Sequence, residues 1–361
     1  MKPDFIIVAG DIFHHARPSN VTLEDAIQSF KRLRDENIPV LAVDGSHDAA
    51  PNVITGTILN PLDAAGLVYY LPRHEGACWR NEKCYVYGIP NYRTRRRTEE
   101  QLPLFYAKNE PSPDPSLYNI FVFHMALDLP GVTPPQMEAE APPELLPDGF
   151  NYYAGGHIHK ASRNRFKTGI LAFSGSTETV YYDDAALKKG FYHVKVNVTG
   201  KTELQHIKLE SLRKFVILEN NYGGMTPSQI TEATVRQVKE SDEEEVIIVP
   251  VMKGILPAEA NRSEIDLTQI RNAAEKAILV RPIVRLKETE VPEEVIRSIF
   301  EGELKDLKTK AYEYFLQMFS ERYPRDEAAE IARLSINIMD PLTRKDEEKV
   351  KEELEAYLSA H

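Results

Sequence analysis

Four short apolar segments in the first half of the chain each end in a cluster of polar residues, and this arrangement limits the fold more than any other feature. The clusters are Gly10-Asp-Ile-Phe-His14, Gly45-Ser-His-Asp48, Phe123-His124 and Gly155-Gly-His-Ile-His159. Continuous apolar runs of this kind are typical of strands buried on both faces. In open α/β sheets, ligands gather outside the carboxyl ends of the strands. We therefore expect an α/β fold in which these four clusters converge on one site.

The same half of the chain predicts a βαβ unit. Phe5 to Ala9 and Ile38 to Val43 are strand-like, and between them apolar residues recur at helical spacing after a capping box, Thr22-Leu-Glu-Asp25. Other segments also have the apolar pattern of strands: Leu67 to Leu71, Lys83 to Ile89, Asn119 to Phe123, Tyr152 to Ala154, Ile170 to Phe173 and Gly190 to Val198.

A second pattern begins near Ser211 and predicts a separate, smaller α/β domain. Strands are expected at Phe215 to Leu218, Val246 to Val251 and Leu279 to Leu286, with helices starting at Thr226-Pro227 and running from Asp266 to Ile278. From Pro292 the strand signals vanish and an amphipathic stripe appears, formed by Leu304, Leu307, Ala311, Tyr314, Phe315 and Met318. The predicted domains are therefore 1–210, 211–290 and a helical tail at 291–361.

Composition bounds the classes of function. The chain has 361 residues, of which 42% are hydrophobic and 27% charged, as in ordinary globular proteins. Two cysteines fit neither a zinc site nor a disulfide framework, and no apolar run approaches the roughly 20 residues that span a bilayer, so we expect a cytoplasmic protein. The net charge is −11, and residues 290–361 hold 18 acidic against 11 basic side chains. DNA binding would therefore need a local basic patch or a basic partner.

The polar clusters contain the residue types that bind transition metals. His157 and His159 are two positions apart, which points both rings to the same side of an extended segment, and Gly155-Gly156 lets the backbone approach a ligand. A carboxylate together with imidazoles suits manganese, iron or zinc. Taken alone, Asp11 is equally consistent with a cap of the turn after its strand, and His124 with a buried core histidine.

In order, these residues resemble the last four motifs of the calcineurin-like metallophosphoesterases, whose pattern runs D-x-H, G-D, G-N-H-[DE], a lone His and G-H-x-H. The wording of Gly10 to His14, Phe150 to Lys160 and Ser174 to Ser176 is similar to that of the SbcD-like DNA double-strand-break repair nucleases. The resemblance implies a two-layered β-sandwich flanked by helices, a small α/β DNA-capping domain and a helical tail that binds an ATPase.

By the same resemblance, the metal ligands are Asp11, Ser46, His124, His157 and His159. Asp11 would bridge two manganese ions, which would stabilise the attacking and leaving oxygens of an in-line phosphodiester displacement. The catalytic residues would be His47, His14 and Asp48. His47 would give a proton or hydrogen bond to the leaving oxygen, with His14 nearby and Asp48 in an orienting role.

Two departures from the family pattern bear on the metals. Ser46 stands where the family has Asn, and a hydroxyl is a shorter and weaker ligand, so we expect that ion to be held more loosely. No D-x-H motif precedes Asp11, which leaves the other ion with Asp11 and His159. The sequence reads as though it started inside a longer protein, and we expect it to bind fewer than two ions per subunit.

Three further predictions concern partners. Four arginines are a candidate contact to DNA phosphates: Arg93, Arg95, Arg96 and Arg97. The alternative is that they form a solvated loop. The family implies a homodimer through Thr22 to Asn37 and Thr55 to Ala65, although these apolar faces could equally cover the sheet. It also implies that the tail docks on the coiled coil of an SMC-like ATPase, the alternative being a helical pair folded back on its own domain.

Three functions remain open at this stage. The first is a manganese-dependent DNA exonuclease and endonuclease of a double-strand-break repair complex, associated with the nucleoid. The second is a phosphoesterase for small phosphodiesters. The third is a catalytically impaired scaffold that binds DNA and the ATPase. The accessory domain and the tail favour the nuclease, because a small substrate does not need them.

Overall fold

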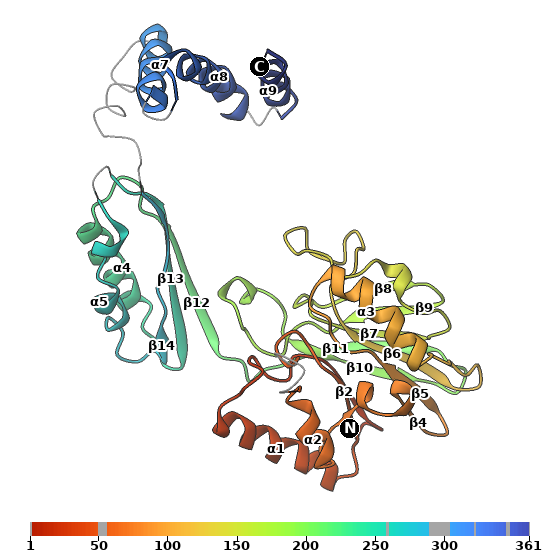
Figure 1. Ribbon diagram of the computed structural model, residues 1–361. Coiled ribbons are helices and arrows are strands. Elements are labelled where there is room, and N and C mark those ends of the chain that lie inside the picture. Colours follow the sequence, from red (N-terminus) through yellow and green to blue (C-terminus); the bar gives the residue numbers. More distant parts are fainter. Residues whose placement is uncertain are drawn as a thin grey trace. The chain divides into compact units, whose positions relative to one another are not determined.

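The structure is a computed structural model that describes residues 2–49, 56–257, 260–288, 304–320, 323–343 and 347–360 (Figure 1). The chain divides into two compact units, Met1–Leu212 and Arg213–His361. The expected start of the tail, between 290 and 291, lies outside the described residues, so the three-domain assignment stays a prediction.

The first unit begins with the predicted βαβ arrangement. Strands β1 (Ile6–Ala9), β2 (Val40–Val43) and β3 (Tyr69–Tyr70) form a parallel sheet in that order. Helices α1 (Asn20–Asp35) and α2 (Leu59–Ala64) cover one face of it (Figure 1). The predicted capping box at Thr22 is wrong, because α1 begins two residues earlier and its N-cap is Ser19, whose hydroxyl accepts the Thr22 N–H at 3.1 Å.

The larger sheet of this unit has six strands, in the order β4 (Cys78–Arg80), β5 (Cys84–Gly88), β6 (Tyr118–His124), β7 (Tyr152–Gly156), β9 (Gly169–Phe173) and β8 (Ser162–Phe166). β5, β6, β7 and β9 run parallel, while the two edge strands are antiparallel to their neighbours. A hairpin of β10 (Gly190–Val196) and β11 (Thr202–Lys208) follows, and α3 (Arg95–Lys108) packs on the larger sheet. Of these strands, the sequence pattern did not predict β4, β8 and β11.

The two sheets form a sandwich because alternate residues of each strand point to opposite sides. In β2, Leu41 and Val43 pack between the sheets, whereas Val40 and Ala42 pack under α1 and α2. In β6, Val122 lies between the sheets and its neighbours point outward to the cluster that contains Leu102 of α3. This arrangement confirms the predicted two-layered sandwich flanked by helices.

The inner face of α1 packs within its own domain. Leu23, Ala26, Phe30 and Leu33 pack against the three-stranded sheet, while Val21 and Ile27 remain exposed. The alternative that this apolar face covers the sheet therefore holds for α1. A dimer would have to use the outward face, and it stays a prediction.

The second unit contains a parallel sheet of β12 (Lys214–Asn221), β13 (Val246–Ile255), β14 (Leu279–Val280) and β15 (Ile283–Lys287). Helices α4 (Pro227–Glu240) and α5 (Leu267–Arg271) cover one face of it (Figure 1). Thr226 is the N-cap of α4, as predicted, and forms a capping box with Gln229. The expected helix to Ile278 is too long, since α5 ends at Arg271. The single strand expected from Leu279 is two short strands that pair with different parts of β13.

The described part of the chain beyond β15 contains the helices α7 (Leu304–Ser320), α8 (Arg325–Thr343) and α9 (Glu347–Ala360). α7 packs on α8, where Ala311, Ala328 and Ala332 are buried. α8 thus covers part of the predicted apolar stripe, while Met318 stays 38% exposed. Within the described ranges, no helix is long and apolar enough to cross a membrane. Short 3-10 helices occupy Leu71–Arg73, Glu75–Ala77, Pro143–Leu145, Tyr182–Asp184 and Arg262–Glu264.

Candidate metal centre

Asp11 lies on the turn that follows β1, in the left-handed backbone region that residues other than glycine adopt rarely. Its φ is +53°, and Gly10 before it has φ +83°. A Cβ on Gly10 would lie 2.4 Å from Nδ1 of His124, so only glycine fits there. Oδ1 of Asp11 accepts the backbone N–H of His47 at 2.9 Å, which ties the turn after β1 to the turn after β2. The strained turn therefore places a carboxylate between two of the predicted clusters.

His124 ends β6 and is 2% exposed. Its Nδ1 lies 2.7 Å from the carbonyl oxygen of Ala9, and its Nε2 lies 3.2 Å from Oδ2 of Asp11. The second contact has the distance of an ion pair but not the geometry of a hydrogen bond, so Nε2 is a buried polar atom without a hydrogen-bond partner. Burial lowers the pKa of His124, but Asp11 and the Ala9 carbonyl outweigh it and the pKa is raised.

The same contact acts on Asp11 in the opposite direction. Burial would raise the pKa of Asp11, but the close contact with His124, its charge and the hydrogen bond from the His47 N–H outweigh it, and the pKa is lowered. Asp11 and His124 thus each favour the charged form of the other. When the imidazole is protonated, its proton occupies the place where a cation would neutralise the carboxylate.

His157 and His159 follow β7. A Cβ on Gly156 would lie 1.7 Å from the Ala9 carbonyl oxygen, so β7 and β1 approach each other at a point where only glycine fits. His157 has φ +82°, its ring centroid is 5.2 Å from that of His124, and its Nε2 is 3.7 Å from Oε2 of Glu140. Burial, assisted by the charge of His124, lowers the pKa of His157 to about 4. His157 is therefore neutral at physiological pH, which is the form that binds metals.

His159 is held by a residue from a later segment. Its Nδ1 lies 2.5 Å from Oδ2 of Asp184, and its ring stacks at 6.3 Å on Tyr181. The rings of His14 and His47 stack 4.9 Å apart, and the His14 ring centroid also lies 6.4 Å from that of Tyr181. Burial and the positive charges of neighbouring histidines lower the pKa of His14.

Asp48 contacts the loops rather than the ring that it was expected to orient. It is buried, and its carboxylate accepts the backbone N–H groups of Ile12 at 2.9 Å, Phe13 at 2.8 Å and Gly45 at 3.3 Å. Because both oxygens are used by these amides, Asp48 joins the turn after β1 to the turn after β2. Any effect of Asp48 on His47 acts through the backbone.

Ser46 lies in the same turn, and its role stays a prediction. A Cβ on the preceding Gly45 would lie 2.1 Å from Oδ1 of Asp11, so the backbone there touches the carboxylate. The predicted residues Asp11, His47, His124 and His157 are thus linked by contacts of the turns after β1, β2, β6 and β7.

The arginine cluster is not the loop that we expected. Thr94 caps α3, and the three arginines that follow form its first turn. Arg95 pairs with Glu99 at 3.0 Å and with Asp128 at 3.1 Å, and Arg96 pairs with Glu100 at 2.9 Å. The Arg93 guanidinium donates to the Ala49 carbonyl. Acidic residues therefore compete for two of the four side chains, and Arg97 is the one on this turn that no described acidic side chain approaches within 4.0 Å.

Four residues at the site were missed from the sequence. Glu140 accepts the Ala126 N–H at 3.0 Å and faces His157, while Asn91 donates from its side chain to the His124 carbonyl. Asp184 and Tyr181 contact His159. None of them belongs to a motif or follows a regular spacing from the ligands.

The residues fit a divalent cation by their chemistry. The buried Nε2 of His124 lacks a hydrogen bond, a carboxylate faces it, and a neutral imidazole, His157, lies beside them. Among the described residues, no three His, Cys, Asp or Glu side chains are already spaced as the ligands of one ion. A cation would therefore replace the proton between Asp11 and His124, and these two side chains would adjust around it.

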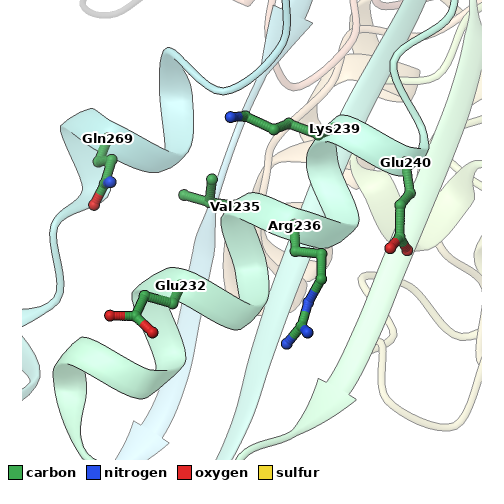
Figure 2. Close-up of a pocket in the computed structure, with 6 residues that line it drawn as sticks. All are labelled: Glu232, Val235, Arg236, Lys239, Glu240 and Gln269. Carbon is green, nitrogen blue, oxygen red and sulfur yellow. The ribbon is translucent and has the colours of Figure 1, made fainter.

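The hollow on α4 and α5 in the second unit offers no comparable site. Figure 2 shows its six lining residues, Glu232, Val235, Arg236, Lys239, Glu240 and Gln269. Both charge signs are present, and five of these side chains are exposed. No buried polar group among them points to a ligand.

Comparison with known proteins supports the family suggested by the motifs. Residues 1–161 match the calcineurin-like phosphoesterases. The chain is 26% identical over 314 residues to the DNA double-strand break repair protein Mre11 of Methanopyrus kandleri, covering 83% of this chain and 67% of that protein. It is 32% identical over 233 residues to Mre11 of Methanocaldococcus jannaschii (60% and 58%) and 26% identical over 364 residues to Mre11 of Thermoplasma acidophilum (98% and 87%). Residues 1–161 are therefore similar to the calcineurin-like phosphoesterases, and the chain as a whole is similar to archaeal repair proteins named Mre11.

Proposed function

We propose that this protein is a metal-dependent nuclease that hydrolyses phosphodiester bonds of DNA in double-strand-break repair. The observation that carries the proposal is the Asp11–His124 pair, whose unbonded imidazole nitrogen is buried against a carboxylate at the edge where four strands end. The similarity to proteins named for double-strand-break repair supports DNA as the substrate. The chain spans 67% and 58% of two of these relatives, so activity, substrate and partners are all part of the proposal.

The metal ligands would be Asp11, Ser46, His124, His157 and His159, and manganese is the proposed metal. Bound there, the metal would neutralise the phosphate and supply the attacking hydroxide. The protein's own side chains do the rest. Asp11 is fixed by the His47 amide, and His124 by the Ala9 carbonyl, so the donors keep their positions before substrate arrives.

His47 is the proposed proton donor to the leaving oxygen, with His14 stacked against it. The ring of His14 places a second imidazole beside His47, and burial lowers the pKa of His14. The lowered pKa favours the neutral form of His14, and His47 is the residue to which we assign the proton transfer.

The remaining parts carry proposed partner contacts. The described part of the 211–290 region is a small α/β domain that we propose caps DNA. Its acidic turn is built into the fold, because Asp242 accepts the backbone N–H groups of Glu275, Lys276 and Ala277. We propose that the tail from 291 docks on the coiled coil of an SMC-like ATPase, through the part of α7 that includes Met318. A homodimer and a place in the cytoplasm, at the nucleoid, complete the proposal.

A nuclease assay with matched histidine variants tests this function. Wild-type protein with Mn²⁺ should degrade duplex DNA ends, and EDTA should abolish the activity. His47→Ala should keep its Mn²⁺ affinity and lose roughly 10²–10⁴-fold in turnover. His124→Ala should lose Mn²⁺ binding, whereas His193→Ala on β10 should match wild type.

Three results would contradict the proposal in different ways. Equal loss of Mn²⁺ binding in His47→Ala and His124→Ala would make His47 a ligand. Hydrolysis of bis(p-nitrophenyl) phosphate without cleavage of DNA would favour the small-substrate phosphoesterase. DNA and ATPase binding without hydrolysis of either substrate would favour the scaffold.

A further inference from the structure

The turn Tyr182–Asp184 places a carboxylate against a histidine that follows β7. Oδ2 of Asp184 lies 2.5 Å from Nδ1 of His159, a short contact for a nitrogen and an oxygen. The turn is closed by the Asp184 N–H, which donates to the Tyr181 carbonyl at 2.9 Å. The Tyr181 ring stacks on the His159 ring at an interplanar angle of 17°. One turn therefore contacts the edge and the face of the same imidazole.

The carboxylate decides which ring nitrogen of His159 carries the proton. An ionised carboxylate only accepts hydrogen bonds, so the nitrogen that faces it must be the N–H donor. In a neutral imidazole the other nitrogen, Nε2, then keeps its lone pair. That lone pair is what a divalent cation needs, and Nε2 is the ring nitrogen that Asp184 leaves available.

His124 uses the same device with a different acceptor. Its Nδ1 faces the Ala9 carbonyl at 2.7 Å, and a carbonyl oxygen also only accepts. Nε2 of His124 is accordingly the atom that faces Asp11. His124 and His159 are thus both held through Nδ1, His124 by a backbone carbonyl and His159 by a side-chain carboxylate.

We propose that Asp184 is a positioning residue of the metal centre, which fixes His159 as the tautomer with Nδ1 protonated so that Nε2 is presented to the metal. The inference rests on the proposed function only in taking His159 as a ligand. Hydrogen bonds of this kind orient metal-binding histidines in many proteins, and their removal weakens metal binding roughly 10–100-fold.

The segment around the turn is anchored well enough for this role. The Ser176 N–H donates to the His159 carbonyl at 3.2 Å, and the Gly190 N–H donates to the Ser176 carbonyl at 3.2 Å. Lys189 is 2% exposed, and its Nζ donates to the Ser176 hydroxyl at 2.8 Å. The buried ammonium also interacts with Asp184 through its charge. Residues 176–190 therefore hold both the backbone and the ring of His159.

Nuclear magnetic resonance of the wild-type protein in EDTA tests the tautomer directly. The ring nitrogens of His159 are assigned by comparison with His159→Gln and recorded near pH 9, well above the ordinary histidine pKa of about 6.5. We expect the nitrogen shifts of a single tautomer with Nδ1 protonated. A ring with Nε2 protonated, or a rapid mixture of the two forms, would refute the proposal without any variant having to fold.

Two aspartate variants connect the tautomer to metal affinity. Asp184→Asn keeps the shape but places an amide that donates as readily as it accepts, so both tautomers of His159 should appear. Mn²⁺ affinity, measured by calorimetry, should fall roughly 10–100-fold. Asp183→Asn removes the same charge from the neighbouring residue and should leave tautomer and affinity unchanged.

The outcomes separate this proposal from the proposed function. If Asp184→Asn keeps a single tautomer and wild-type affinity, Asp184 does not position His159. If Asp183→Asn lowers the affinity equally, the effect is one of net charge and the proposal also falls. If tautomer and affinity change as expected while the wild type cleaves no DNA, the positioning role stands and the nuclease assignment is wrong.

Discussion

Replacement of Gly156 by alanine should damage the metal centre and the sandwich together. The new Cβ would lie 1.7 Å from the Ala9 carbonyl oxygen and 2.6 Å from Nδ1 of His124, whereas real Cβ contacts essentially never fall below 3.0 Å. β7 and β1 must therefore separate by more than an ångström. Such overpacking costs about 1–3 kcal/mol, and loss of the hydrogen bond between Ala9 and His124 adds about 1–3 kcal/mol because both groups are buried. We expect Gly156→Ala to lower the free energy of unfolding by about 2–6 kcal/mol.

The single tryptophan makes this measurable for the first unit alone. Trp79 lies on β4, 5.4 Å from the Phe5 ring, and packs against the core between the sheets. Guanidinium denaturation followed by its fluorescence should show a midpoint lower by about 0.5–1 M. The control is Gly223→Ala in the second unit, whose Cβ would meet Asn221 at 3.3 Å and needs little adjustment. A Gly156→Ala protein with the wild-type midpoint and unchanged Mn²⁺ binding would refute the close approach of β7 to β1.

Four further predictions follow from the same contacts. Asp11 raises the pKa of His124 above its ordinary 6.5, so Mn²⁺ must displace the proton on the His124 imidazole to bind there. The Mn²⁺ affinity measured by calorimetry should therefore fall about tenfold for each pH unit below this raised pKa, and a shallow pH profile would refute the ion pair. Burial raises the pKa of Asp44 from 3.8 to about 6, so the stability that its protonated form contributes is full below pH 3.8 and is lost as the pH rises through 6. Asp44→Asn should remove this pH-dependent loss of unfolding free energy, on the order of 3 kcal/mol in EDTA. A variant with the pH profile of the wild type would contradict the prediction. Arg97→Ala should weaken DNA binding and reduce its salt dependence by about one phosphate, more than Arg95→Ala does, since Arg95 is paired with two carboxylates; equal effects in a salt titration would exclude this difference. Deletion of 292–361 should abolish binding to the ATPase coiled coil and leave the Trp79 unfolding transition unchanged, and a lower midpoint would make the tail part of the first unit's stability.

The strands that carry the site were predictable because each is an apolar run that ends abruptly in polar residues. β2, β6 and β7 are buried on both faces and β1 is half-buried, so their sequences are mainly apolar. β8 was not predicted for the opposite reason. It is an edge strand, Ser-Arg-Asn-Arg-Phe, in which only Phe166 is buried, so its apolar pattern is too short to be recognised.

The groups that act on the ligands were not predictable from spacing. Asp184 reaches His159 across 25 residues of sequence, and Glu140 lies near His157 from a loop without periodic structure. A motif reports residues that one backbone segment places together, whereas these contacts arise when separate segments pack. Asp48 is a second example. Its place in the motif suggested that it orients a histidine, but in the structure both of its carboxylate oxygens accept hydrogen bonds from backbone amides.

Three glycines explain why the ligand positions depend so strongly on backbone contacts. At Gly10, Gly45 and Gly156, an added Cβ would fall within 2.6 Å of Asp11 or His124 side-chain atoms. The turns after β1, β2 and β7 are therefore in direct contact with the carboxylate and imidazole that face each other at 3.2 Å. A metal ion that replaces the proton between Asp11 and His124 needs these turns to move apart. The metal affinity therefore depends on the free energy of moving the turns as well as on the donor atoms. Substitutions at the glycines should consequently change metal affinity as much as substitutions of the ligands, although none of the three provides a donor.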